Sequence, residues 1–239
     1  MTDARDHLAL ALDVDDLVEA MRLARLLQPW FGVAKVGLEL FTAAGPVALT
    51  ALRDLGFRVF ADLKLHDIPT TVERTASVLG VLGASYVTMH ASGGEPMLRA
   101  GVEGLARGAA AAGAEPPVAL AVTVLTSEAD AGGHVFAHRV ADAVEAGCGG
   151  LVCAAAEVAQ AKTLAPRLLA VVPGIRPAGV PTHDQARPAT PADAIAAGAD
   201  LLVIGRAVTR ADDPAAAAAE VTAAVAEGLA VPGRSGTPR

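Results

Sequence analysis

The chain has 239 residues, of which 53% are hydrophobic, and its formal net charge at pH 7 is −7. This length allows a large hydrophobic core in one domain or two, and the acidic balance argues against a surface that binds nucleic acid or an anionic membrane. Gly, Pro or charged residues interrupt every apolar run before it reaches bilayer-spanning length, so no membrane helix is expected.

Short apolar runs of strand length recur along the chain, separated by segments rich in Ala and Leu. The expected strands are His7–Leu12, Val33–Gly37, Phe57–Asp62, Tyr86–His90, Val118–Val124, Gly150–Cys153, Leu168–Val172 and Leu201–Ile204. Expected helices include Asp15–Leu27, Pro46–Leu55, one opened by a capping box of Thr70 and Glu73, and Pro214–Ala230. Eight alternations of this kind predict the α/β class and a (β/α)₈ TIM barrel of parallel strands, rather than an open doubly wound sheet.

No linker or shift in composition divides the chain, which predicts a single domain. We expect residues 1–230 to form the catalytic barrel and the tail 231–239, with two prolines and two glycines, to be disordered. The absence of Gly-x-Gly-x-x-Gly after the first strand and of a Walker-type sequence argues against dinucleotide and nucleoside-triphosphate binding. Cys148 and Cys153 are expected to be buried thiols, and the N-terminus does not resemble a signal peptide, so we expect a cytoplasmic protein.

The segment FADLKLHDIPTT, residues 60–71, places three charges of alternating sign at the end of the third predicted strand. Asp62 and Lys64 are two residues apart, so their side chains share one face of a regular strand. Asp67 follows, just before Ile68-Pro69, where the proline favours an extended backbone that ends the strand. Any one of these charges is as typical of a solvated turn as of a functional site. The pattern as a whole favours a functional site.

Other polar residues also follow the predicted strands, at the end of the barrel where such folds place their active sites. They include Asp13, Lys35, the segment His90–Gly94, Thr126, Arg176 and the segment Gly205-Arg206. Lys35 is the most unusual, because lysine is rarely buried without a partner. We favour a functional lysine paired with aspartates on neighbouring strands over one that snorkels to the barrel rim.

The last two strand ends predict a phosphate site. Arg176 and Arg206 supply cations there, and Gly174 and Gly205 let the backbone approach a ligand closely. The long loop of residues 178–191, which contains Gln185, predicts a lid over that ligand.

These segments resemble the orotidine 5′-phosphate decarboxylase family. The family motif Asp-x-Lys-x-x-Asp-Ile-Pro-x-Thr is matched by Asp62, Lys64, Asp67, Ile68, Pro69 and Thr71. Further similar segments occur in the family's order between residues 8 and 214: Leu10–Asp13, Lys35–Gly37, His90–Gly94, Val122–Ser127, Pro173–Pro177, Asp184-Gln185 and Val203–Arg206. The resemblance implies decarboxylation of orotidine 5′-monophosphate (OMP) to uridine 5′-monophosphate (UMP) in pyrimidine biosynthesis, without metal or other cofactor.

The resemblance also implies a role for each matching residue. Lys64, cationic between Asp62 and Asp67, would stabilise and protonate a C6 carbanion, with Lys35 in the same charge network. Contacts to the substrate would come from Asp13 and Lys35 at the ribose, Thr126 at the pyrimidine, and Arg176, Gln185, Gly205 and Arg206 at the phosphate. Asp67, Ile68 and Thr71 would reach the partner's site, which implies a homodimer.

Alternatives stay open at this point. One is a related Mg²⁺-dependent sugar-phosphate decarboxylase or aldol-type enzyme, although Lys35 stands where such enzymes carry an acidic metal ligand. Another is a non-catalytic barrel that binds a phosphate ligand, since fold does not fix function. His134 and His138 have the helical spacing of metal ligands, but no nearby acid or cysteine completes a site, so we interpret them as a surface pair.

Overall fold

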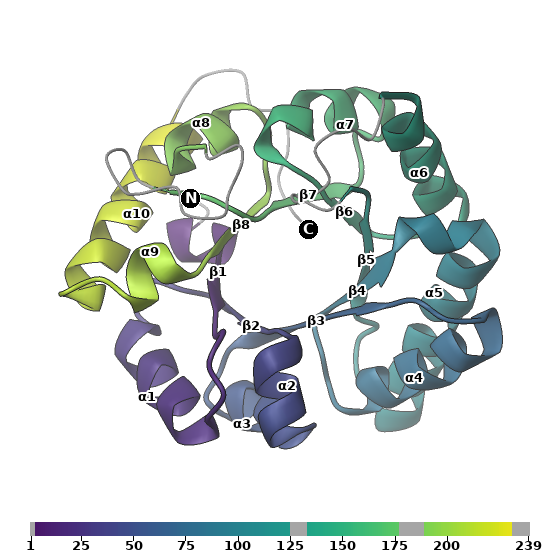
Figure 1. The fold of residues 1–239 in the computed structure, drawn as a ribbon, viewed down its shortest axis with the longest axis horizontal. Helices are drawn as coiled ribbons and strands as arrows, with labels where there is room; N and C mark the ends of the chain where they lie inside the picture. The colour runs from purple at the N-terminus through teal and green to yellow at the C-terminus, as the bar shows by residue number, and fades with distance from the viewer. Residues whose placement is uncertain (1–2, 125–132, 177–188, 231–239) are drawn as a thin grey trace.

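The strands form a closed barrel in which each is parallel to its neighbours and β8 returns to pair with β1 (Figure 1). The computed structural model describes residues 3–124, 133–176 and 189–230. The strands are β1 (Leu8–Ala11), β2 (Val33–Val36), β3 (Arg58–Leu65), β4 (Tyr86–His90), β5 (Val118–Val122), β6 (Gly150–Val152), β7 (Leu169–Val172) and β8 (Leu201–Ile204). The predicted (β/α)₈ barrel is therefore confirmed.

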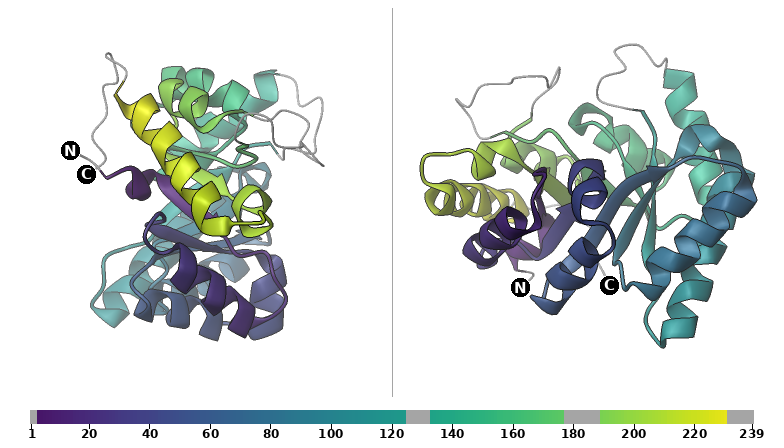
Figure 2. Two further views of the ribbon diagram at one scale, coloured as in Figure 1. Left: turned by 90° about the vertical axis from the view of Figure 1, so that its left-hand side faces the viewer. Right: turned by 60° about the horizontal axis from the view of Figure 1, so that its bottom comes forward.

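Helices surround this barrel and cover its outer face (Figures 1 and 2). They are α1 (Leu17–Leu27), α2 (Leu38–Ala44), α3 (Val47–Asp54), α4 (Pro69–Val81), α5 (Gly94–Ala112), α6 (Gly133–Glu145), α7 (Val158–Leu164), α8 (Pro191–Ala196), α9 (Arg206–Thr209) and α10 (Pro214–Leu229). Short 3₁₀ turns occur at η1 (Ala4–His7), η2 (Ala91–Gly93) and η3 (Ala155–Glu157). Among the described residues, no helix is long and apolar enough to cross a bilayer.

The strand side chains alternate between two apolar layers, as expected for strands buried on both faces. Those that point outward pack against the helices in the larger cluster. Those that point inward fill the barrel: Ala9, Ala11, Val33, Phe60, Tyr86, Leu120, Val171, Leu201 and Val203. Successive inward positions on a strand are two residues apart. Lys35, Asp62 and Thr88 each come two residues after an inward-facing residue (Val33, Phe60 and Tyr86 respectively), so they also face the barrel interior.

Several local predictions are wrong. Helix α4 begins at Pro69 with Ile68 as its N-cap, so Thr70 and Glu73 form no capping box. Proline is favoured in the first helical turn, where it needs no hydrogen-bonded N–H, and Glu73 instead pairs with Arg107 of α5. Strand β3 continues to Leu65 instead of ending at Asp62, and His7 lies in η1 before β1. The predicted tail 231–239 lies outside the described residues.

Candidate active site

An irregularity in β3 shapes the centre of the site. On β4, Val87 and Met89 are two residues apart, but their partners on β3, Ala61 and Leu65, are four apart. The extra residues form a bulge, and Lys64 within it has a φ of 51°. This left-handed conformation is uncommon for a residue with a side chain, and such residues concentrate at functional sites. The regular alternation expected from the sequence is therefore broken where the charges lie.

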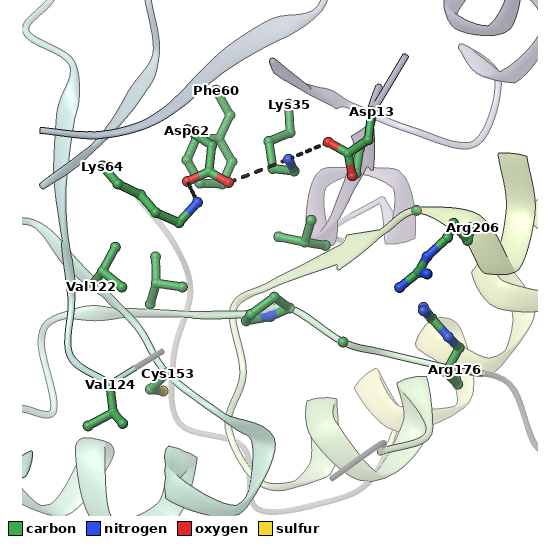
Figure 3. Close-up of a pocket in the computed structure, with 16 residues that line it drawn as sticks. Asp13, Lys35, Phe60, Asp62, Lys64, Val122, Val124, Cys153, Arg176 and Arg206 are labelled. Atoms are coloured by element: carbon green, nitrogen blue, oxygen red, sulfur yellow. Dashed lines mark hydrogen bonds and ion pairs between the residues drawn. The ribbon is translucent and has the colours of Figure 1, made fainter. Parts of the chain in front are cut away.

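Four charged side chains form a row across the carboxyl ends of β1, β2 and β3 (Figure 3). Lys35 Nζ lies 3.0 Å from Asp13 Oδ1 and 3.4 Å from Asp62 Oδ2, and Lys64 Nζ donates to Asp62 Oδ1 at 2.8 Å. We call Asp13, Lys35, Asp62 and Lys64 the charged row. The expected pairing of Lys35 with aspartates on both neighbouring strands is present, and its side chain is only 9% exposed.

The charged row determines the ionisation of its buried carboxyl group. Burial is the largest single influence on the pKa of Asp62 and acts to raise it, but the ammonium groups of Lys35 and Lys64, with hydrogen bonds from Lys64 and Thr88, together hold the pKa below its usual range. Asp62 is therefore a carboxylate at neutral pH. It presents a fixed negative charge beside the ammonium group of Lys64.

Asp67, Ile68 and Thr71 are exposed and do not line the pocket of their own chain. Asp67 Oδ1 accepts a hydrogen bond from the Ile68 backbone N–H at 2.6 Å, and the Ile68 side chain is 66% exposed. Within one chain, then, the structure brings Asp62 and Lys64 together but leaves the third charge of the motif on the surface.

Two arginines face each other at the other side of the pocket, across the cavity from Lys64 (Figure 3). Arg176 follows β7 and is buried, while Arg206 opens α9 directly after Gly205. Gly174 has a φ of 76°, which only glycine adopts readily, and it turns the chain between β7 and Arg176. Paired guanidinium groups are suited to a phosphate dianion.

The cavity between the charged row and the arginines has a volume of about 220 Å³. Part of its wall is apolar and consists of residues to which the sequence analysis gave no role in the site: Phe60, Val122, Val124, Val152, Cys153, Pro173 and Val203. Burial raises the pKa of the Cys153 thiol to about 12, so this group stays protonated and serves as an apolar surface. The alternation of inward and outward side chains could have identified several of these residues, since they lie at the same barrel end as the charges.

Thr126 and Gln185 lie outside the described residues, as does most of the predicted lid. His134 and His138 are exposed on α6, where His138 Nε2 lies 3.7 Å from Asp142 Oδ2. Within residues 3–124, 133–176 and 189–230, no group of three His, Cys, Asp or Glu side chains is placed to hold a metal ion.

Comparisons with known proteins agree on one family. The family model described as "Orotidine 5'-phosphate decarboxylase / HUMPS family" matches residues 6–221. Orotidine 5′-phosphate decarboxylase from Anaeromyxobacter sp. (strain K) is 46% identical over 229 residues, which cover 91% of this chain and 97% of that protein. The enzyme of the same name from Moorella thermoacetica is 44% identical over 234 residues, covering 93% of both chains. The crystal structure of the Lactobacillus acidophilus enzyme matches with a TM-score of 0.77 and 33% identity, covering 91% of this chain and 98% of that one.

Proposed function

The chain belongs to the orotidine 5′-phosphate decarboxylase / HUMPS family, and on that premise we propose that it converts OMP to UMP in pyrimidine biosynthesis. The observation that carries the proposal is the charged row, which lies across one cavity from Arg176 and Arg206. A substrate with a phosphate at one end and a carboxylated ring at the other matches the cations and the charged row respectively.

We propose that the phosphate of OMP binds Arg176 and Arg206 and that Gly205 allows close approach of the backbone. The ribose hydroxyls then lie near Asp13 and Lys35, and the pyrimidine lies against the apolar wall of the cavity. Binding energy from the phosphate, remote from the reacting carbon, is available to hold the ring against the charged row. Thr126 at the pyrimidine amide and Gln185 at the phosphate complete the proposed set.

The proposed reaction needs no electron-accepting cofactor. The bond between C6 and the carboxylate breaks, CO₂ leaves, and the electron pair stays on C6 in the plane of the ring. The Lys64 ammonium, 2.8 Å from Asp62, stabilises that charge and then transfers a proton from Nζ to C6. Asp62 lies against the departing carboxylate and keeps Lys64 protonated. Lys64 regains its proton from solvent after UMP is released.

We also propose a homodimer in which the two chains share their sites. Its support is the exposure of Asp67, Ile68 and Thr71, which follow β3 directly but do not line the pocket of their own chain. Further along α4, Val78 and Val81 are 57% and 51% exposed, so the same helix also carries exposed apolar surface. In the dimer, Asp67 of each chain flanks Lys64 of the other.

Residues 1–230 form the catalytic domain, and the enzyme works in the cytoplasm.

The proposal is tested by incubating the protein with OMP and following the loss of pyrimidine absorbance. We expect turnover that survives exhaustive chelation and gains nothing from added Mg²⁺. Turnover that chelation abolishes would favour the Mg²⁺-dependent enzymes instead. Tight binding of OMP without turnover would favour the non-catalytic phosphate-binding barrel.

A further inference from the structure

A buried threonine on β4 contacts both central members of the charged row. Thr88 is 0% exposed and faces the barrel interior one step beyond Tyr86. Its Oγ1 lies 2.9 Å from the backbone nitrogen of Lys64 and 3.0 Å from Asp62 Oδ1. The same Asp62 oxygen accepts from Lys64 Nζ. One hydroxyl thus links the main chain of Lys64 to the carboxylate that holds the Lys64 side chain.

The chemistry of the three groups fixes the direction of both hydrogen bonds. A backbone N–H can only donate, so the Lys64 amide donates to a lone pair of Thr88 Oγ1. Asp62 is ionised and can only accept, so the single hydroxyl proton of Thr88 points to Asp62 Oδ1. A hydroxyl is one donor and two acceptors, which meets both demands at once. Valine meets neither, although it has nearly the same shape.

The linkage falls where the backbone needs support. Lys64 lies in the bulge of β3 with its φ of 51°, and register with β4 is regained at the pair Leu65 and Met89. A residue in this conformation persists only when its surroundings hold it. The regular hydrogen bonding between β3 and β4 is interrupted here, and the Thr88 hydroxyl accepts the hydrogen bond from the Lys64 backbone N–H in place of a strand partner.

From this geometry we propose that Thr88 is a positioning residue of the reaction: its hydroxyl holds Lys64 in the bulged conformation and orients Asp62, so that the ammonium group meets C6 of the substrate. Thr88 is not among the residues that line the cavity, so we expect it to act through Lys64 and Asp62 without touching the substrate. The proposal rests on the proposed function, because it takes Lys64 as the proton donor. It concerns the efficiency of the proton-transfer step and not the binding of the phosphate.

Two pairs of proteins isolate the hydroxyl. Thr88→Val differs from the wild type by hydroxyl to methyl, and Thr88→Ala differs from Thr88→Ser by the hydroxyl alone. We expect kcat for OMP to fall by about ten- to a hundredfold in Thr88→Val and Thr88→Ala, since a buried N–H and a carboxylate lose a partner. Thr88→Ser should stay within about threefold of the wild type. The dissociation constant for UMP, measured by calorimetry, should change less than about threefold in all three variants.

Thr123→Val is the matched control. Thr123 is also a buried threonine of the barrel, 1% exposed, and its hydroxyl donates to the Val152 carbonyl at 3.0 Å, away from Asp62 and Lys64. In Thr123→Val, the Val152 carbonyl still accepts a hydrogen bond from the backbone N–H of residue 123, so it is not left without a donor. A merely structural effect of losing a buried hydroxyl would lower thermal stability in Thr123→Val and Thr88→Val alike. Only Thr88→Val and Thr88→Ala should lose kcat.

Two kinetic results would overturn the proposal: kcat within about threefold of the wild type in Thr88→Val, or Thr88→Ser as impaired as Thr88→Ala. If Thr88→Val does not fold, the Ala and Ser pair decides alone. A wild type that does not turn over OMP contradicts the proposed function and not this inference. In that case crystal structures decide, because the proposal requires Lys64, whose φ is 51° in the wild type, and its ammonium group to change position when the hydroxyl is removed. An unmoved Lys64 would refute it.

Discussion

Lys35 and Asp62 are the most buried charges of the charged row, with side chains 9% and 14% exposed. Removing ions from water is costly, and the cost is recovered only where partners and hydrogen bonds surround each ion. Asp62 has such partners in two ammonium groups and the Thr88 hydroxyl. In the proposed reaction these fixed charges lie beside the reacting carbon, so little reorganisation is needed when the carbanion forms.

The proposed phosphate contact gives the first prediction at this scale. Arg206→Ala should raise KM and lower kcat/KM for OMP. The loss of transition-state stabilisation should be about 3 kcal/mol, the order of a charged hydrogen-bond pair. The nucleoside orotidine, which lacks the phosphate, should be a very poor substrate for the wild type and be little affected by the substitution. Arg210→Ala serves as the matched control, because Arg210 is exposed at the end of α9 and does not line the cavity. Equal losses with nucleotide and nucleoside would show that Arg206 does not hold the phosphate.

The lowered pKa of Asp62 gives a second prediction, on stability. A carboxyl group whose pKa is lower in the folded than in the unfolded protein stabilises the fold above its unfolded pKa, which is about 3.9. This contribution is lost as the pH falls through the folded pKa. The free energy of unfolding should therefore depend less on pH below about pH 4 in Asp62→Asn than in the wild type. Urea unfolding at a series of acidic pH values measures this, and parallel curves for the two proteins would contradict it.

The charged residues could be predicted from the sequence because charge in or beside an apolar strand is conspicuous. Lys35 interrupts an apolar run, and Asp62 and Lys64 end one. Thr88 carries no such signal, because threonine is common in strands and is tolerated in the interior wherever its hydroxyl finds a partner. Its two partners are brought to it by the bulge in β3, which depends on tertiary pairing with β4.

At the scale of elements, β3 and the turn that leads to α4 carry the three charges of the motif. Strand β3 supplies Asp62 and Lys64, the following turn supplies Asp67, and α4 begins at Pro69. Ile68-Pro69 predicts that the strand ends before it, because the residue before proline prefers an extended backbone. The structure agrees, since Ile68 has φ −57° and ψ 149°. The predicted capping box of Thr70 and Glu73 is absent, because the helix begins earlier, at Pro69, and has no side-chain cap.

Glycines let α5 pack backbone to backbone against α4. A Cβ atom at Gly108 would lie 2.0 Å from the Ser77 carbonyl oxygen, and one at Gly104 would lie 2.2 Å from that of Glu73. Gly108→Ala should therefore destabilise the protein by about 1–3 kcal/mol from overpacking. This outweighs the gain of about 1 kcal/mol that alanine brings to a helix interior.

Chemical denaturation measures the effect, with Ala106→Gly on the exposed face of α5 as the control. The control should lose only about 1 kcal/mol, the difference in helix propensity. A Gly108→Ala protein as stable as the wild type or more stable would show that α4 and α5 can separate without cost.

At the scale of the whole molecule, the barrel was predictable because most strands are buried on both faces and appear as nearly continuous apolar runs. Chain order equals strand order around the barrel, so no crossover had to be inferred. The proposed dimer has no comparable signal in composition or periodicity, since these do not report what covers an exposed surface. The proposed partner contacts of Asp67, Ile68 and Thr71 follow from the family resemblance.

Shared sites predict complementation between two inactive variants. Lys64→Ala and Asp67→Ala should each be nearly inactive as homodimers. In a mixed dimer, one site carries both lesions and the other combines an intact Lys64 with an intact Asp67 from its partner. Mixing the two proteins under subunit exchange should therefore restore activity, to about half the wild-type rate per heterodimer. If exchange is demonstrated and activity stays at the level of the parents, Asp67 acts within its own chain.

The central claim is that Lys64, fixed against Asp62 in the charged row, stabilises and protonates the carbanion at C6. The most direct measurement is kcat/KM for OMP in the wild type and in Lys64→Ala, with the dissociation constant of UMP measured on the same preparations. General acid catalysis of this kind contributes about 10²–10⁴-fold, so the variant should lose at least about 10³-fold when loss of electrostatic stabilisation is included. UMP should bind within about tenfold of the wild type, because Arg176 and Arg206, which we propose hold its phosphate, lie across the cavity from Lys64 (Figure 3). A folded Lys64→Ala protein that keeps kcat/KM within about tenfold of the wild type would contradict the account.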